Sequence, residues 1–173
     1  MIVRWGHIAR LAALLLFVAS CDTAGSDPPC TGADGLNPEH AEALACVGWL
    51  DYVETHTCRV EYVDSIPSED FNTAIYGRAH CDEGRIQVAL RRPDIGGRLE
   101  AVPFVQSLAT IVHEAAHLED GCRNGEPPAQ AAEGRFLADF NRIDQEERAI
   151  VEERVQAGIF DFDDLCLYRP DDS

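Results

Sequence analysis

The sequence predicts one α+β domain, because helical and strand-like patterns follow each other in separate blocks. A helical apolar pattern begins after Pro38, and three short strand-like segments, two of them alternating, follow between residues 58 and 90. Helical periodicity returns at residue 103 and continues towards the C-terminus. With 173 residues, of which 46% are hydrophobic, the chain is long and apolar enough to bury a core of its own. We expect a small sheet of about three strands packed with one helix that carries the candidate site and two or three further helices.

Residues 1–20 have the composition of an export signal and are excluded from the fold. Arg4 and Arg10 precede an apolar run over residues 11–19 that is too short to span a bilayer. The run ends in Ala19-Ser20-Cys21, which resembles the lipobox of bacterial lipoproteins. That resemblance implies lipidation of Cys21 and anchoring in the bacterial cell envelope, facing the periplasm or the exterior. The alternative is an ordinary secretory signal that happens to precede a cysteine.

The cysteine count agrees with export. Assigning Cys21 to lipid leaves six of the seven cysteines, and six in an oxidising compartment predict three disulfides. Their pairing stays open. These six are Cys30, Cys46, Cys58, Cys81, Cys122 and Cys166. Residues 21–37, rich in Gly, Pro, Ser and Asp, are predicted to be a flexible tether to a domain over residues 38–173.

The first half of the domain is predicted to contain one helix and three strands. Asn37 is a suitable cap and Pro38 a suitable first helical residue for a helix that runs to about Glu54. Alternating segments predict strands at 58–63 and 85–90, a further strand is expected around 74–80, and a turn over 82–84 separates the last two.

The second half is predicted to be helical. A helix should run from about residue 103 to 119 and stop at Gly121, and another should run from about 128 to 142. Asp144 and Glu147 have the spacing of a capping box, which predicts a fourth helix that ends near Gly158.

The net charge of −17 argues against a nucleic-acid partner, since phosphate recognition requires a basic face. It also argues against electrostatic docking on anionic lipid, so we expect membrane contact only through the lipid anchor. We expect the protein to be a monomer.

Residues 113–117 read His-Glu-Ala-Ala-His. Two histidines four residues apart leave the same face of a helix, where both can bind one Zn²⁺ ion. Leu108, Ile111, Ala115 and Leu118 form an apolar stripe on the opposite face, so the helix can bury one side and present the histidines to a cleft.

This segment resembles the active-site helix of the zincin metallopeptidases. The resemblance implies a minimal zincin-like fold, a Zn²⁺ cofactor held by His113 and His117, and Glu114 as general base on zinc-bound water. It also implies a peptide or protein substrate. The metzincin pattern is excluded, because Asp120 and Arg123 replace its Gly and His and the only methionine is Met1. The aspzincin pattern is also missing.

The remaining group, the gluzincins, completes its zinc site with a Glu on a following helix, which implies Glu133 as the third ligand. Glu133 flanks the apolar stripe of its predicted helix and can point inward. Asp139, on the other side of that stripe, is an alternative ligand or a partner for a histidine N–H, and Glu126 and Asp120 are further alternatives. The Asp that gluzincins often carry four residues after the ligand Glu is replaced by Leu137.

Two functions compete on these observations. The first is an active zinc metallopeptidase, and the second is a zinc-binding but non-catalytic envelope lipoprotein stapled by disulfides. A weaker possibility is a chain without metal. Tyr76, Arg78 and His80 are weak candidates for stabilising an oxyanion, and the strand at 85–90 is a candidate for pairing with an extended substrate.

Overall fold

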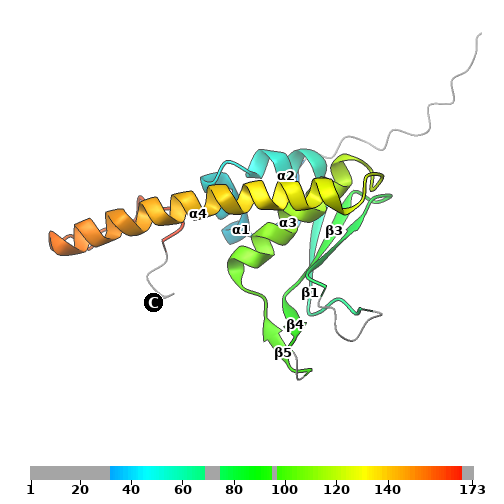
Figure 1. Cartoon of the computed structure of the whole chain (residues 1–173), viewed down its shortest axis with the longest axis horizontal. Coiled ribbons are helices and arrows are strands. Elements are labelled where there is room, and N and C mark those ends of the chain that lie inside the picture. The colour runs from blue at the N-terminus through cyan, green and yellow to red at the C-terminus, as the bar shows by residue number, and fades with distance from the viewer. Residues whose placement is uncertain (1–31, 69–74, 95–96, 169–173) are drawn as a thin grey trace, which may run out of the picture.

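The computed structural model describes residues 32–68, 75–94 and 97–168 (Figure 1). The predicted α+β class is confirmed: within these residues helices pack with small sheets. The predictions for the export signal, Cys21 and Cys30 lie outside them. In the part of the chain that is described, no helix is both long and apolar enough to cross a membrane.

Two short helices replace the single N-terminal helix that was predicted. Asn37 caps helix α1, Pro38–Cys46, by accepting a hydrogen bond from the Glu39 N–H at 2.8 Å. The helix stops at Gly48, whose φ of +76° favours glycine. The N–H groups of Gly48 and Trp49 donate to the carbonyls of Ala45 and Leu44, a Schellman arrangement. Helix α2 then covers Leu50–His56. The apolar stripe continues through this break, which is why periodicity alone missed it.

The main sheet has the order β1-β3-β2, where β1 is Arg59–Val63, β2 is Gly77–His80 and β3 is Arg85–Ala89. Strands β1 and β3 are parallel, and β2 pairs antiparallel with β3 through the predicted turn. Val60, Ile86 and Val88 are buried on the face that packs on the helices. Strand β2 has one paired edge, and its other edge borders the cleft described below.

A second, two-stranded sheet joins β3 to the next helix. Strands β4, Arg91–Pro93, and β5, Leu99–Ala101, form an antiparallel hairpin that projects from the body in Figure 1. Helix α3, Phe104–Glu119, follows and carries the His-Glu-Ala-Ala-His segment. Its predicted apolar stripe is confirmed, because Leu108, Ile111 and Ala115 are fully buried and Leu118 packs against the core.

One long helix, α4, Glu126–Gln156, replaces the two that were predicted. The expected capping box is wrong. Asp144 instead forms an ion pair with Arg148 one turn on, at 2.9 Å. Glu147 is buried and accepts backbone N–H groups of Cys166, Leu167 and Tyr168 at 2.8 Å each. No Gly or Pro separates residues 142 and 144, so the helix has no reason to end there.

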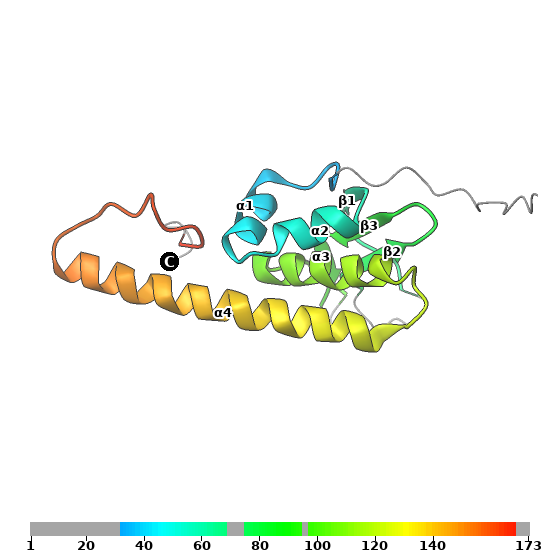
Figure 2. The same ribbon diagram turned by 90° about the horizontal axis from the view of Figure 1, so that it is seen from above.

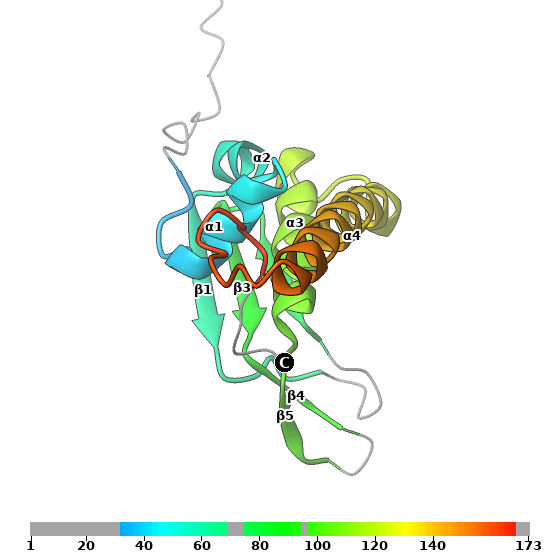
Figure 3. The ribbon, with the colours of Figure 1, turned by 90° about the vertical axis from the view of Figure 1, so that its left-hand side faces the viewer.

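Helix α3 lies between α4 and the sheet, with α2 also against it (Figures 2 and 3). The C-terminal half of α4 extends past the body, and the chain after it turns back (Figure 2). The core lies where α3 meets its neighbours, and its largest side chains include Phe136, Leu44, Ile86 and Leu108.

Disulfides tie the elements together. Cys46–Cys166 joins the end of α1 to the C-terminal segment, and Cys81–Cys122 joins the end of β2 to the loop after α3. Cys58 is also disulfide-bonded. Residues 32–37, assigned by composition to the tether, instead lie against the domain: Asp34 exchanges backbone hydrogen bonds with Cys58 and Val60, and Ala33 and Leu36 pack on the core.

Candidate metal centre

The two histidines of the motif lie on the cleft side of α3. The ring centroids of His113 and His117 are 5.0 Å apart, and both side chains are largely but not completely buried. Because the opposite face of α3 is buried in the core, the helix cannot rotate this face away from the cleft without disturbing its packing.

Glu126 completes a group of three possible metal ligands with these histidines. Its carboxylate oxygens lie 3.2 Å from Nε2 of His113 and 3.6 Å from Nε2 of His117. Zinc bonds of about 2.0–2.1 Å at tetrahedral angles place neighbouring donor atoms roughly 3.3 Å apart. The spacing of the three donor groups therefore fits a zinc ion.

The loop between α3 and α4 places Glu126. Helix α3 ends in a second Schellman arrangement, in which Gly121 (φ +63°) and Cys122 donate to the carbonyls of Leu118 and His117. Gly125, with φ 68° and ψ −151°, occupies a backbone region that is almost exclusive to glycine. The Cys81–Cys122 disulfide ties this loop to β2, so Glu126 begins α4 from a fixed position.

Glu133, the third ligand expected from the gluzincin resemblance, lies on the other side of the His113 ring. Its carboxylate is 2.9 Å from Nδ1 of His113, whereas Nε2 of that ring faces Glu126. An acceptor at Nδ1 fixes the tautomer that leaves Nε2 free for a metal. The Glu133 carboxylate therefore lies beside the candidate metal centre, where it can hold the His113 ring in position.

The other carboxylates considered as ligands are engaged elsewhere. Asp139 accepts a hydrogen bond from Nε1 of Trp49 at 3.0 Å. Asp120 accepts the backbone N–H groups of Arg123 and Asn124, both at 3.2 Å, and so shapes the loop before α4. Neither belongs to the group that the histidines form with Glu126.

Glu114 lies between α3 and strand β2, and it is buried. Burial raises the pKa of its carboxyl group to about 7, against the opposing effects of nearby His113 and of a hydrogen bond from the Ala79 N–H. Glu126 raises this pKa further and Arg78 lowers it. A carboxyl group in this environment exchanges a proton readily near neutral pH, as a general base must.

Gly77 makes room for Glu114. A Cβ atom at this position would lie 2.4 Å from Cγ2 of Thr110 and 2.8 Å from Cγ of Glu114. Thr110 cannot yield easily, because its hydroxyl donates to the Gln106 carbonyl at 2.8 Å. We therefore expect Gly77→Ala to push β2 away from α3 and to destabilise the fold by about 1–3 kcal/mol, the usual cost of overpacking. Denaturant unfolding measures this free energy.

Gly134 supplies the matched control. Nothing lies within 4 Å of a Cβ atom built at this position. Gly134→Ala in the middle of α4 should therefore stabilise the protein by about 0.4–1 kcal/mol. Equal stability of Gly77→Ala and the wild type would contradict the tight contact between β2 and α3.

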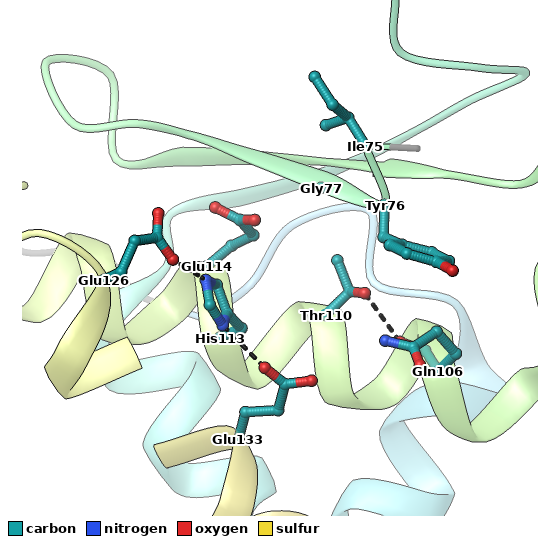
Figure 4. Close-up of a pocket in the computed structure, with 9 residues that line it drawn as sticks. All are labelled: Ile75, Tyr76, Gly77, Gln106, Thr110, His113, Glu114, Glu126 and Glu133. Carbon is teal, nitrogen blue, oxygen red and sulfur yellow. Dashed lines mark hydrogen bonds and ion pairs between the residues drawn. The ribbon is translucent and has the colours of Figure 1, made fainter. Parts of the chain in front are cut away.

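The cleft extends to both sides of the metal centre along the edge of β2. One lobe of about 340 Å³ runs along α3 towards Gln106, and the other, of about 370 Å³, reaches Cys122 and Gly125. Both volumes lie in the range typical of ligand sites. The lobes share residues at the metal centre, as Figure 4 shows for the first: Ile75, Gly77, His113, Glu114 and Glu126.

The three weak oxyanion candidates lie in different places. Arg78 lines the lobe near Cys122. Tyr76 points along the other lobe towards Gln106 and away from Glu114 (Figure 4). His80 lies 3.2 Å from the side-chain oxygen of Gln87 on the neighbouring strand and lines neither lobe. The cleft borders β2 and not β3, the strand at 85–89 that was considered for substrate pairing.

Comparisons with known protein families, with curated proteins and with solved structures found no match to this chain.

Proposed function

We propose that this protein is a zinc-dependent metallopeptidase that hydrolyses peptide bonds. The observation that carries the proposal is the convergence of Nε2 of His113, Nε2 of His117 and the Glu126 carboxylate beside the buried carboxyl group of Glu114. Two imidazoles and a carboxylate are a common protein ligand set for catalytic zinc, which keeps one coordination position open.

Each residue has a distinct role in this proposal. His113, His117 and Glu126 hold the zinc, and Glu133 holds the Nδ1 proton of His113. Zinc, when bound, supplies Lewis acidity to the scissile carbonyl and to a water molecule. Glu114 takes a proton from the attacking water and passes it to the leaving nitrogen. Peptide or protein substrate lies in the cleft along β2.

The proposed location is the bacterial cell envelope, with the domain anchored through lipid at Cys21. The disulfide-bonded state of Cys46, Cys58, Cys81, Cys122 and Cys166 supports an oxidising compartment, since such bonds are rare in the cytosol.

The test is zinc loading together with hydrolysis. Protein stripped with a chelator and reloaded should bind close to one equivalent of zinc, measured by atomic emission. Hydrolysis of a peptide library should disappear on stripping and return on loading. Protein that retains no zinc after loading, or that hydrolyses peptides equally well without it, would refute the proposed function.

A further inference from the structure

The lobe that runs from the metal centre to Gln106 has two chemically different ends (Figure 4). Carboxylates surround the metal end. At the far end lie the hydroxyl group of Tyr76 and the side-chain amide of Gln106, and Thr110 lies between the two ends. We call this cavity the Gln106 lobe.

Arg92 on strand β4 gives the far end a positive charge. Its Nη1 donates to the Tyr76 hydroxyl oxygen at 2.6 Å, and its guanidinium carbon lies 5.6 Å from the centre of the Tyr76 ring. Arginine is always protonated and only donates. The phenol oxygen must therefore accept from Arg92, which leaves the Tyr76 O–H free to donate to a ligand.

Two further groups, one on Arg92 behind Tyr76 and one on Gln106 in the lobe, have no hydrogen-bond partner within the described residues. Nε of Arg92 is buried and makes no hydrogen bond there. The side-chain amide of Gln106 also makes none, because only its backbone carbonyl accepts, from Thr110. A buried cationic N–H without a partner is costly. The far end thus presents the Tyr76 hydroxyl and the Gln106 amide to a ligand, with the positive charge of Arg92 directly behind Tyr76, and this arrangement suits an anion.

The net charge of −17 does not exclude anion binding at the far end of the lobe. Charges beyond about 8 Å are largely screened at physiological ionic strength, whereas Arg92 touches Tyr76 directly. Glu126 and Glu133 lie at the metal end, where zinc offsets their charge when it is bound. A ligand that spans the lobe therefore meets positive charge at the end away from the zinc.

We propose that the Gln106 lobe binds a carboxylate group of the substrate, which accepts a hydrogen bond from Tyr76 and is attracted by Arg92. The proposal rests on the proposed metallopeptidase function and specifies its substrate class: peptides with an acidic side chain, or a free C-terminus, close to the cleaved bond. A carboxylate supplies acceptors for the Tyr76 hydroxyl and the Gln106 amide, and its charge is attracted by Arg92 behind Tyr76, whereas an apolar side chain would leave the Tyr76 hydroxyl unpaired.

The experiment compares matched peptides on the zinc-loaded, full-length mature protein in detergent. Mass spectrometry of a digested peptide library first locates the cleaved bond. Peptides with Glu, Gln or Leu at the position nearest that bond then test the side chain, and free-acid and amide C-termini test the terminus. We expect kcat/KM to be at least about tenfold higher for the acid in one of these arms. A preference in the first comparison identifies an acidic side chain as the source of the carboxylate, and a preference in the second identifies the free C-terminus.

Variants assign the preference to the lobe. Arg92→Gln should abolish it, and Tyr76→Phe, which removes only the hydroxyl, should reduce it. Arg91→Gln is the matched control, because this exposed neighbour on β4 carries the same charge and does not reach Tyr76. Loss of the preference in Arg91→Gln, or its retention in both Arg92→Gln and Tyr76→Phe, would overturn the assignment.

Direct binding separates this proposal from the proposed function. The same peptides are titrated calorimetrically into the wild type and Arg92→Gln. Acid-selective binding that is lost in Arg92→Gln supports the lobe even if no peptide is hydrolysed. Hydrolysis without any acid preference leaves the peptidase proposal standing and overturns the carboxylate site. Absence of both hydrolysis and selective binding overturns both.

Discussion

Glu114→Gln is expected to lower peptide hydrolysis by at least about 10²–10⁴-fold, the usual contribution of a general base. Glutamine has nearly the same shape, and its side-chain oxygen can still accept the Ala79 N–H that now binds Glu114. It cannot take a proton from water at neutral pH. Folding and zinc content should therefore remain close to those of the wild type, as circular dichroism and metal analysis will measure.

Glu119→Gln is the control for this substitution, because it makes the same charge change on the same helix. Glu119 is exposed and accepts a hydrogen bond from the Tyr52 hydroxyl at 2.9 Å, outside the metal centre. The hydrolytic activity of Glu119→Gln should match that of the wild type. Hydrolysis that survives Glu114→Gln unchanged would refute the proposed base, and zinc binding without hydrolysis in the wild type would favour the non-catalytic lipoprotein.

Glu126→Gln is expected to weaken zinc binding more than any other neutralisation of a carboxylate on α4. The two carboxylate oxygens of Glu126 lie 3.2 Å from Nε2 of His113 and 3.6 Å from Nε2 of His117, and glutamine removes their charge and replaces one of them with an amide nitrogen. Glu133→Gln should cost only the roughly 10–100-fold that loss of an outer-shell partner costs, because His113 keeps its Nε2. Asp139→Asn, whose carboxylate binds Trp49, should leave zinc affinity unchanged.

Competition with a zinc indicator measures all three affinities under one set of conditions. The series is internally matched, since each member removes one negative charge from the same helix. A larger loss for Glu133→Gln than for Glu126→Gln would restore Glu133 as the third ligand, in line with the gluzincin resemblance.

Features fixed by local chemistry could be predicted from the sequence. The Asn37 cap, the turn before β3, the Gly121 stop and the apolar stripe of α3 each depend on a few neighbouring residues, and the structure has all of them. The placement of His113 and His117 on one face of α3 follows from the same helical geometry.

Features fixed by tertiary contacts could not be predicted. Glu147 has the spacing of a helix cap, but its acceptors are used by the backbone of a segment nineteen to twenty-one residues later. Glu126 was only a further alternative to Glu133, because no local sequence pattern identifies it as a ligand. A glycine-rich loop and the Cys81–Cys122 disulfide bring it to the histidines. The close approach of Gly77 to Glu114 likewise could not be predicted, because it is a contact between a strand and a helix that are far apart in the sequence.

In the proposed bacterial cell envelope, the disulfide connectivity would have a consequence for how the chain matures. The Cys81–Cys122 pair is nested inside the Cys46–Cys166 pair. A chain oxidised in the order in which it emerges would join Cys46 to an earlier neighbour, because Cys166 arrives last. Native pairing then requires thiol–disulfide exchange after synthesis, a process of seconds to hours that isomerases accelerate. A strain without such an isomerase should therefore accumulate mispaired chains whose Glu126 loop is not tied to β2.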